Sequence, residues 1–432
     1  MKKYIFALCC FCSAVNFAQT GSWKNYSTEG EVLARHENAM AKVGNKIVLI
    51  GGRGNKPLNI LDLETNEWTN GAQPPFEIHH LQAVSLDGLI YVLGAFTGGW
   101  PFETPLSHVF IYDISNDIWI TGPEIPENRR RGAAGVAVFE DKIYLVNGII
   151  NGHTSGWVNW LDEFDPYTGE WKILPNAPVA RDHFHAAVIN KKLYVAGGRR
   201  SGSVEGNGFA GTVSETNVYD FNSQKWEILP NIPTPRAGAT TAVLNDKLII
   251  LGGESDLQEK AHGEIELYDP SSKNWKNLPI LGTGRHGTQA VTIQNNILIG
   301  AGSENRGGGP ELTSFEIYSA EKNPVLQSDS LQVGEIVPSL QKLNFLKTGD
   351  TQYFTLKNSS KNLAIPITYL QTNRPENFKV ETPGRLPLIL APGTSIDIQI
   401  TEKADTLLRK NAVLFIKPAG AQAPLEIELI TQ

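Results

Sequence analysis

Tryptophan recurs at a nearly constant spacing through the first two thirds of the chain. Trp68, Trp119, Trp171, Trp226 and Trp275 are separated by 51, 52, 55 and 49 residues. Each tryptophan ends a segment of β-branched or aromatic residues followed by an acidic turn, and this pattern indicates a β-hairpin. A repeat of about 50 residues built from strands is typical of propeller blades and not of helical solenoids. The spacing therefore predicts an all-β repeat protein.

A second repeated segment lies upstream of each tryptophan. It is an apolar strand that ends in glycine or in a residue that replaces glycine. It occupies residues 47–52, 90–94, 143–148, 193–198, 248–253 and 297–302. Sixteen residues before the first glycine position of five copies stand Arg35, Arg131, Arg181, Arg236 and Arg285. In the remaining copy the same count reaches Ile78, which His79 and His80 follow. The constant count predicts that the strand between arginine and glycine is a fixed structural unit.

The glycine pair after an apolar strand, the Tyr-Asp or similar step and the spaced tryptophan resemble the kelch repeat. The resemblance runs from Trp23 to about Tyr318 and implies a six-bladed kelch β-propeller over residues 19–321. Trp23 has no repeat of its own, and the last repeat stops after Tyr318 without its tryptophan. We therefore expect an N-terminal strand to complete the last blade, which removes the open edge that a circular array would otherwise expose.

The C-terminal hundred residues have a different pattern. Residues 332–432 contain about seven short apolar strands separated by turns, which predicts an immunoglobulin-like β-sandwich. The string resembles the Ig-like modules of the Hydin and choice-of-anchor D type. Residues 322–331 are expected to form a linker between the two domains.

The first 18 residues have the order of a secretory signal peptide. Lys2 and Lys3 precede an apolar stretch that ends near the small residue Ala18. We expect export to the periplasm, the cell surface or the extracellular space, with no later segment long enough to span a membrane. All three cysteines of the chain lie in this segment at positions 9, 10 and 12. The mature chain would then lack the cysteine that radical copper oxidases of the galactose oxidase kind require, which excludes that activity.

In a four-stranded blade the arginine positions and the loops after the glycine pairs lie at the same mouth of the channel. A single arginine is expected to brace neighbouring loops, but five together predict contact with a carboxylate or phosphate. Histidines cluster near the same positions, and three loop tryptophans offer faces for stacking on a sugar ring. The candidate ligand-binding residues are Arg35, His79, His80, Arg131, Arg181, His183, His185, Arg236, Arg285, His286, Trp100, Trp157 and Trp160.

Metal and catalytic roles have weaker support in the sequence. His183 and His185 point to one face of a strand as a metal pair would, but a third ligand is not evident, so we expect polar lining and no metal or cofactor. No catalytic residue is assigned. The acidic loop from Glu254 to Glu264 offers calcium ligands but is expected to be solvated.

The sequence therefore predicts an exported kelch-repeat binding protein. Its ligand is expected to be an anionic glycan or protein bound at one mouth of the channel, while the net charge of −7 argues against nucleic acid as a partner. One alternative, which the family resemblance suggests, is a mutarotase or epimerase that acts on an acidic sugar such as a sialate. The other is a scaffold that binds proteins without catalysis.

Overall fold

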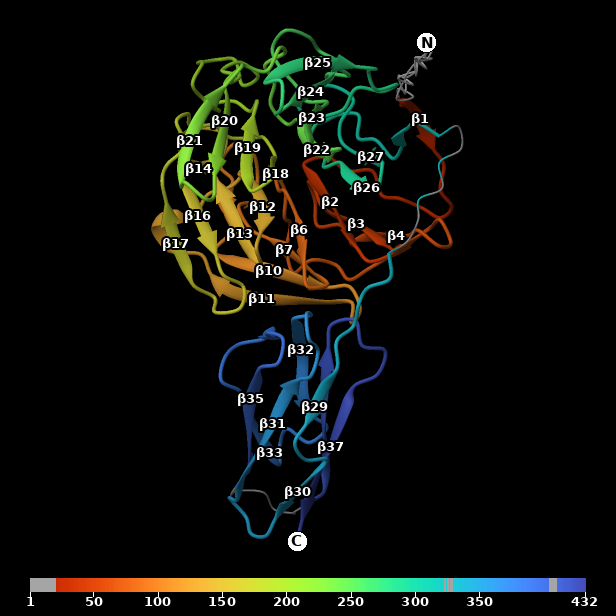
Figure 1. Ribbon diagram of the computed structural model, residues 1–432, viewed down its shortest axis with the longest axis vertical. Helices are drawn as coiled ribbons and strands as arrows, with labels where there is room; N and C mark the ends of the chain where they lie inside the picture. Colours follow the sequence, from red (N-terminus) through yellow and green to blue (C-terminus); the bar gives the residue numbers. More distant parts are fainter. Residues whose placement is uncertain (1–20, 322–323, 325, 327–328, 404–409) are drawn as a thin grey trace, which may run out of the picture.

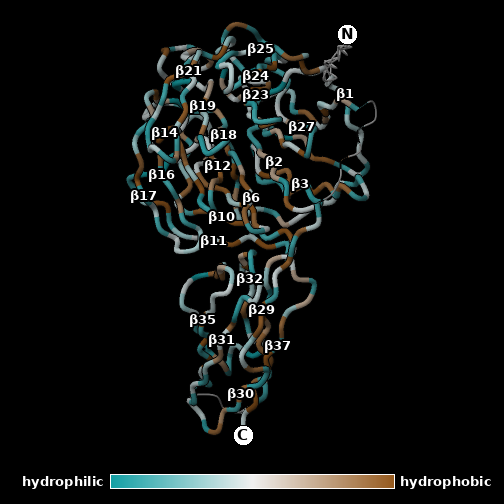
Figure 2. Tube along the Cα trace, in the orientation of Figure 1, coloured by the Kyte–Doolittle hydropathy of each residue, from teal (hydrophilic) through white to brown (hydrophobic). Residues whose placement is uncertain are grey.

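The computed structural model describes residues 21–321, 324, 326, 329–403 and 410–432. The predicted signal peptide and its cysteines lie outside this part of the chain. Within it the secondary structure is β-strand, apart from one short 3-10 helix, η1 (Glu127–Arg129). No helix in the described ranges has the length and apolar character needed to cross a membrane. Hydrophobic residues lie along the strands of both the N-terminal and the C-terminal regions (Figure 2).

Six four-stranded antiparallel sheets, the blades, follow one another around the N-terminal region (Figure 1). Blade one contains β2 (Asn38–Val43), β3 (Lys46–Gly51), β4 (Asn59–Asp62) and β5 (Glu67–Asn70). Blade two contains β6 (Val84–Leu86), β7 (Leu89–Val92), β10 (His108–Asp113) and β11 (Ile118–Glu124). Blade three contains β12 (Gly135–Phe139), β13 (Lys142–Val146), β16 (Leu161–Phe164) and β17 (Trp171–Leu174). The described chain is thus all-β, with a kelch propeller region.

The remaining three blades complete the circle. Blade four contains β18 (Ala186–Ile189), β19 (Lys192–Ala196), β20 (Thr216–Asp220) and β21 (Lys225–Leu229). Blade five contains β22 (Thr240–Leu244), β23 (Lys247–Leu251), β24 (Ile265–Asp269) and β25 (Asn274–Leu278). Blade six contains β26 (Val291–Ile293), β27 (Asn296–Gly300), β28 (Phe315–Ser319) and β1 (Ser22–Tyr26). The innermost strands β2, β6, β12, β18, β22 and β26 contact one another in a closed ring.

The N-terminal strand closes the circle as the sequence predicted. Strand β1 pairs with β28 in antiparallel register, so that Trp23 lies opposite Tyr318. The two rings are 5.5 Å apart between centroids. The outer edge of the last blade is therefore covered by a strand from the other end of the propeller sequence, which protects it from pairing with another chain.

The periodic tryptophans tie each blade to the one before it. The indole nitrogens donate hydrogen bonds to acceptors on the preceding blade or, for Trp68, to Thr28 just after β1. The other four acceptors are the backbone carbonyls of Ala72, Glu124, Pro175 and Pro230. A buried or half-buried indole that has a partner for its N–H fits this interblade position well. The tryptophan period therefore reports the blade repeat.

Two hairpins extend the second and third blades beyond the regular pattern. They pair β8 (Phe96–Thr97) with β9 (Thr104–Pro105) and β14 (Ile149–Asn151) with β15 (Ser155–Trp157). Both interrupt the connection between the second and third strands of their blade, which is the segment that follows the glycine position. These insertions therefore lie at the end of the channel where the sequence placed the variable loops.

The C-terminal region contains two sheets around a shared hydrophobic core. The first contains β29 (Ile336–Pro338), β31 (Thr351–Asn358), β35 (Ser395–Glu402) and β33 (Phe378–Glu381). The second contains β30 (Lys342–Phe345), β37 (Leu425–Thr431), β36 (Ala412–Pro418), β32 (Ile365–Thr372) and β34 (Leu388–Leu390). The seven predicted strands are all present, and the sequence missed β29 and β30, which are short and lie next to the linker.

The C-terminal region contacts the propeller near the turns of the first two blades. Leu331, the last residue of the predicted linker, packs against the glycines of the β2–β3 and β6–β7 turns, at Gly44 and Gly88. The Ser115 hydroxyl accepts a hydrogen bond from the backbone of Gly420. These turns lie at the ends of the strands away from the glycine positions and their loops. The C-terminal region therefore leaves the opposite mouth of the channel uncovered.

Candidate functional site

One backbone position in each blade, which we call the ring position, surrounds the channel. It lies two residues after the arginine register and holds Glu37, His80, Ala133, His183, Gly238 and Gly287. All six residues have positive φ, at 57°, 53°, 48°, 56°, 60° and 62° respectively. Backbone hydrogen bonds link neighbours around the ring, for example from His80 N to Glu37 O and from Gly238 N to His183 O. The chain therefore presents six equivalent positions to the channel.

Three of the ring positions carry large polar side chains in a conformation that L-residues rarely adopt. Glycine tolerates positive φ without a steric penalty, and the ring has glycine at Gly238 and Gly287. Glu37, His80 and His183 instead hold side chains there, at a cost of about 1–2 kcal/mol each. Such strain persists where the surroundings impose it and often accompanies a functional site.

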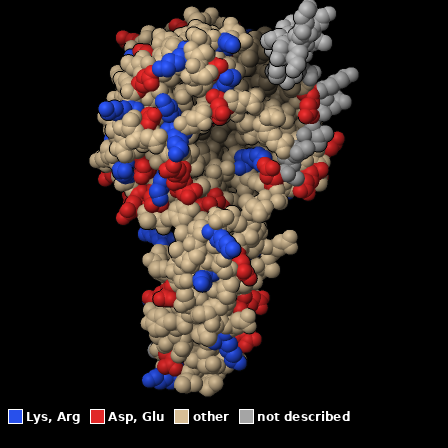
Figure 3. Space-filling view, in the orientation of Figure 1, with Lys and Arg blue, Asp and Glu red and all other residues tan. Residues whose placement is uncertain are grey.

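A cavity of about 760 Å³ opens above this ring. Glu37 and His80 form part of its floor, and His153, Arg199, Glu254 and His286 form its walls. Trp100 and the loop 204–209 lie at the rim. Below the ring the channel narrows to a space of about 20 Å³, which is the size of one water molecule. Figure 3 shows a hollow near the centre of the propeller, with charged side chains around it.

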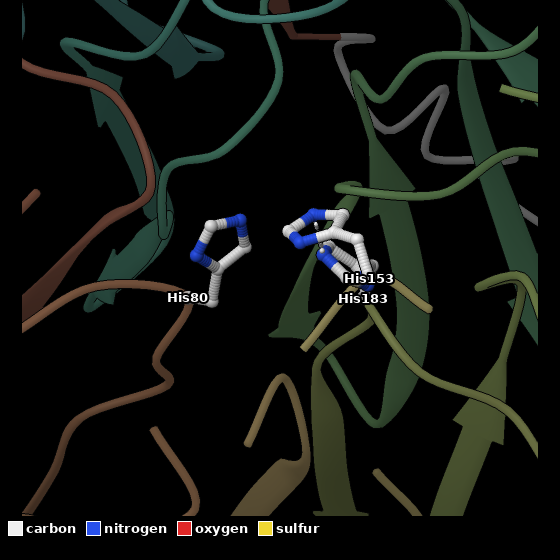
Figure 4. Close-up of side chains that lie close together, drawn as sticks. All are labelled: His80, His153 and His183. Carbon is white, nitrogen blue, oxygen red and sulfur yellow. Dashed lines mark hydrogen bonds between the residues drawn. The ribbon is translucent and has the colours of Figure 1, made fainter. Parts of the chain in front are cut away.

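Three imidazoles meet at the floor of the cavity. One nitrogen each of His80, His153 and His183 lies within 4.8 Å of the others. In Figure 4 the ring of His80 faces the other two across a short gap. His80 and His183 come from ring positions, and His153 comes from the turn between β14 and β15. The described ranges contain no other group of three histidine or acidic side chains with metal-ligand geometry.

Buried carboxylates orient two of these imidazoles. Asp182 Oδ1 accepts a hydrogen bond from His183 Nδ1 at 2.5 Å, and Glu103 Oε2 accepts one from His153 Nδ1 at 2.9 Å. Burial alone would raise the pKa of Glu103, but His153 and Arg53 hold it at about 2. Burial would likewise raise the pKa of Asp182, and His183 reverses that shift. Both groups are therefore carboxylates at neutral pH.

A second set of charged groups lines the wall. Glu254 accepts a hydrogen bond from Arg199 at 2.7 Å, and its other oxygen accepts one from the backbone of Gly307. Burial would raise the pKa of Glu254, but His286 and Arg199 lower it to about 2. Glu37 lies 3.4 Å from His80 Nε2 and 3.8 Å from His286 Nδ1, and neither distance makes a strong hydrogen bond. The cavity therefore contains acidic and basic groups in close alternation.

The five register arginines lie inside the blades and do not line the cavity, so the expected anion-binding ring is not formed. Each is at most 1% exposed. Each guanidinium donates to the backbone carbonyl sixteen residues later. These carbonyls belong to Gly51 (3.0 Å from Arg35), Asn147 (2.6 Å from Arg131), Gly197 (2.9 Å from Arg181), Gly252 (2.6 Å from Arg236) and Ala301 (3.1 Å from Arg285). The constant count therefore reflects an internal brace, and the prediction of anion contact by these residues was wrong.

The predicted histidines divide into two groups. His80, His183 and His286 border the cavity or its floor. His79 lies behind His80, with its Nδ1 2.6 Å from His80 Nδ1. His185 lies in the narrow neck below, where burial lowers its pKa to about 4 and Thr240 Oγ1 lies 3.0 Å from its Nδ1. His183 and His185 therefore do not act as a pair, because His183 meets His153 instead.

The three predicted loop tryptophans have different surroundings. Trp100 is 71% exposed and lies at the rim of the cavity. Trp157 does not border the cavity, and the guanidinium of Arg200 lies 5.5 Å from its ring centre. Trp160 is covered by Arg129 at 4.2 Å. Only Trp100 of the three therefore has the position expected of a ligand contact.

Several residues of the site were missed in the sequence. They are Glu37, Arg53, Glu103, His153, Asp182, Arg199 and Phe209, while Glu254 was considered only as part of a calcium loop. Glu254 in fact pairs with Arg199, and His262 pairs with Glu264 at 3.0 Å, so the acidic residues of that loop do not converge. The sequence pattern could have predicted part of this site. Counting two residues beyond the arginine register in each repeat places Glu37, His80 and His183 at equivalent positions.

Comparison with known proteins agrees with this architecture. The chain is 29% identical over 266 residues to Kelch-like protein terF of Aspergillus terreus, covering 57% of each chain. It is 26% identical to alpha-scruin of Limulus polyphemus over 54% of this chain and 26% of that protein. The chain thus spans 57% of the length of the first of these relatives and 26% of the second.

The solved structures lead to the same fold. The structure of YjhT superposes with a TM-score of 0.56 and 18% identity, over 65% of this chain and 94% of that one. Residues 235–282 match the Kelch motif. Residues 11–253, more than half of the chain, match the Attractin/LZTR1 beta-propeller. The chain therefore belongs to the Attractin/LZTR1 beta-propeller family of kelch proteins.

Proposed function

We propose that this chain is a binding protein that takes up a small hydroxyl-rich ligand, of the glycan class, in the cavity above the ring. The observation that carries this proposal is the cavity itself. Its volume of about 760 Å³ falls in the range of about 300–1,000 Å³ that is usual for small-molecule sites. Below its floor the channel narrows to a space of about 20 Å³. A ligand would enter from one side and stop at the histidines and Glu37.

The charges of the cavity favour a neutral ligand over the anionic one that the sequence suggested. Arg53 and Arg199 each already pair with a buried carboxylate, Glu103 and Glu254. Glu37 adds a further acidic group, and within the described ranges its ionic contacts are with the histidines His80 and His286. Hydroxyl groups can donate to carboxylates and accept from guanidinium groups, so a polyol or sugar fits such an alternating surface. An acidic ligand would meet Glu37 at the floor.

Trp100 supplies the apolar contact that sugar binding needs. Its indole is 71% exposed at the rim, next to Pro101, which also borders the cavity. Phe209 lies on the same rim and carries Arg306 over its ring at 5.0 Å. The apolar face of a sugar ring can stack on such an indole, while the polar edge of the sugar reaches the charged wall.

The first test is a glycan array with the full chain, followed by titration calorimetry with neutral and acidic members of any class that binds. We expect Trp100→Ala to weaken binding by about 1 to 2 kcal/mol, or roughly five- to thirtyfold. Trp157→Ala is the matched control, because Trp157 is 40% exposed but lies outside the cavity. If Trp100→Ala binds the glycan with the same affinity as wild type, the cavity rim is not part of the binding site.

The same samples distinguish binding from catalysis. If the bound sugar exchanges its anomers faster with the protein than without it, as seen by NMR, the chain is a mutarotase and the proposal of a pure binding protein fails. If acidic sugars bind more strongly than neutral sugars, the ligand is anionic, as the sequence suggested. No binding of any glycan would overturn the proposed ligand class.

Two further proposals concern the context of the propeller. We propose that the chain acts outside the cytoplasm, on the basis of the signal-like order of residues 1–18. We also propose that residues 332–432 form an immunoglobulin-like domain, because nine strands in two sheets share one core there. Its contact with the turns away from the cavity suits a spacer that holds the binding mouth outward.

A further inference from the structure

We propose that His80, His153 and His183 form a binding site for a divalent transition-metal cation, Zn²⁺ above all, on the floor of the cavity. This site goes beyond glycan binding and does not depend on it. The three imidazoles would hold the ion and leave one coordination position directed at the cavity. Three imidazoles with an open fourth position is an arrangement that zinc accepts.

The spacing of the nitrogens fits this ion. Zn–N bonds of about 2.0 Å in tetrahedral geometry place ligand nitrogens about 3.3 Å apart. His153 Nε2 and His183 Nε2 lie 3.0 Å apart, and the group as a whole lies within 4.8 Å. His80 faces the other two imidazoles across the gap that the ion would fill (Figure 4).

The hydrogen-bond partners assign the tautomers of the pair. His183 Nδ1 donates to Asp182 and His153 Nδ1 donates to Glu103, since a carboxylate can only accept. In the neutral imidazoles both Nε2 atoms are then unprotonated, so two lone pairs face each other at 3.0 Å. This contact is repulsive unless a proton or a cation lies between the two atoms.

The same argument assigns the tautomer of the third imidazole, His80. His79 Nε2 lies 2.9 Å from the carbonyl oxygen of Gly98 and therefore donates to it; Arg53 Nη1 lies farther away, at 3.3 Å. His79 Nδ1 is then an acceptor, so His80 Nδ1 must donate across their 2.6 Å contact. His80 Nε2 is thereby left unprotonated, and its neighbour Glu37 Oε2, at 3.4 Å, is another acceptor. All three Nε2 atoms thus offer lone pairs to one small space.

A bound cation explains this arrangement better than an extra proton. One cation can accept all three lone pairs, whereas one proton can lie between only two of the nitrogens. Metal-bound histidines usually donate their other ring N–H to a carboxylate or another acceptor, as all three do here. His80 and His183 both have positive φ, so the fold holds these side chains at the ring despite the backbone strain.

The donor set selects the class of ion. Ca²⁺ and Mg²⁺ require oxygen ligands, whereas imidazole suits Zn²⁺, Cu²⁺ and Ni²⁺. Glu37 Oε2 lies 3.4 Å from His80 Nε2, where it would accept a hydrogen bond from a water bound to the ion. The remaining position faces the cavity, where a hydroxyl of a ligand would meet the ion.

The test is titration of ZnCl₂ into the full chain after chelator treatment, followed by calorimetry. We expect one ion per chain. Glu103→Gln should weaken Zn²⁺ binding by about 10- to 100-fold, as loss of an orienting carboxylate does. His153→Ala, which removes a ligand, should weaken it more. His153 lies in a hairpin turn and not in a blade strand, so this variant should keep its fold, which circular dichroism and melting check.

His36→Ala is the matched control, because His36 borders the same cavity but pairs with Glu311. It should bind Zn²⁺ like wild type. The visible spectrum of Co²⁺ provides a second readout, since tetrahedral nitrogen coordination gives intense bands that His153→Gln should abolish. No saturable binding, or unchanged Zn²⁺ affinity in a folded His153→Ala variant, overturns the site. Glycan arrays with and without Zn²⁺ keep this outcome separate from ligand binding.

Discussion

Two positions that lie two residues apart in every blade have opposite roles. The arginine register lies inside the blade, repeats in five of six copies and donates to a backbone carbonyl of its own blade. The ring position faces the channel and varies among glutamate, histidine, alanine and glycine. The repeated position builds the scaffold, and the varied one builds the site. In a repeat protein the departures from the repeat therefore deserve more functional weight than the repeat itself.

The largest effect should come from breaking the scaffold side of this comparison. Arg236→Ala leaves Glu266, whose side chain is 1% exposed, without its cation at 2.7 Å. Removal of one partner from such a buried pair destabilises by about 3–5 kcal/mol. Denaturant unfolding measures this. Arg200→Ala, which removes a half-buried arginine beside Trp157, is the control and should cost under about 1 kcal/mol. Equal losses in the two variants would contradict the internal-brace role.

An intermediate effect is expected for a charged group of the cavity wall. Glu254 has a folded pKa of about 2, below its ordinary value of 4.5, so its ionised form stabilises the fold above pH 4.5. That contribution, roughly 3 kcal/mol, is lost as the pH falls through about 2. The difference in unfolding free energy between wild type and Glu254→Gln should therefore shrink between pH 4.5 and 2. A difference that stays constant over this range would show that the charge of Glu254 is not stabilising.

The smallest effect on stability should come from the ring position. Glu37→Gly introduces the residue that blades five and six have there. Relief of the positive φ, about 1–2 kcal/mol, offsets the backbone entropy of glycine, about 0.5–1 kcal/mol. We expect the unfolding free energy to change by less than about 1 kcal/mol, while ligand binding falls. Glu37→Ala keeps the strained φ and should be the less stable of the two. A large destabilisation by glycine would mean that Glu37 supports the scaffold.

The sequence by itself determined the repeat, the closure of the last blade by β1 and seven of the nine strands described in the C-terminal region. These features follow from local patterns: alternating apolar residues, turn glycines and an indole at a fixed distance. The count of sixteen between arginine and glycine was also real, because it reports a hydrogen bond that recurs in five blades. Its interpretation was wrong, since a spacing cannot show whether a guanidinium points into a blade or into the channel.

Only the tertiary structure decided which side chains meet. His153 lies in a hairpin that no repeat predicts, yet it reaches His183, thirty residues away in sequence, with Nε2 atoms 3.0 Å apart. Glu103 and Asp182 approach the same pair from different blades. A circular array brings the mouths of all its blades to one point, so residues from every repeat become neighbours there. That convergence is a property of the closed ring, and a linear reading of the chain does not contain it.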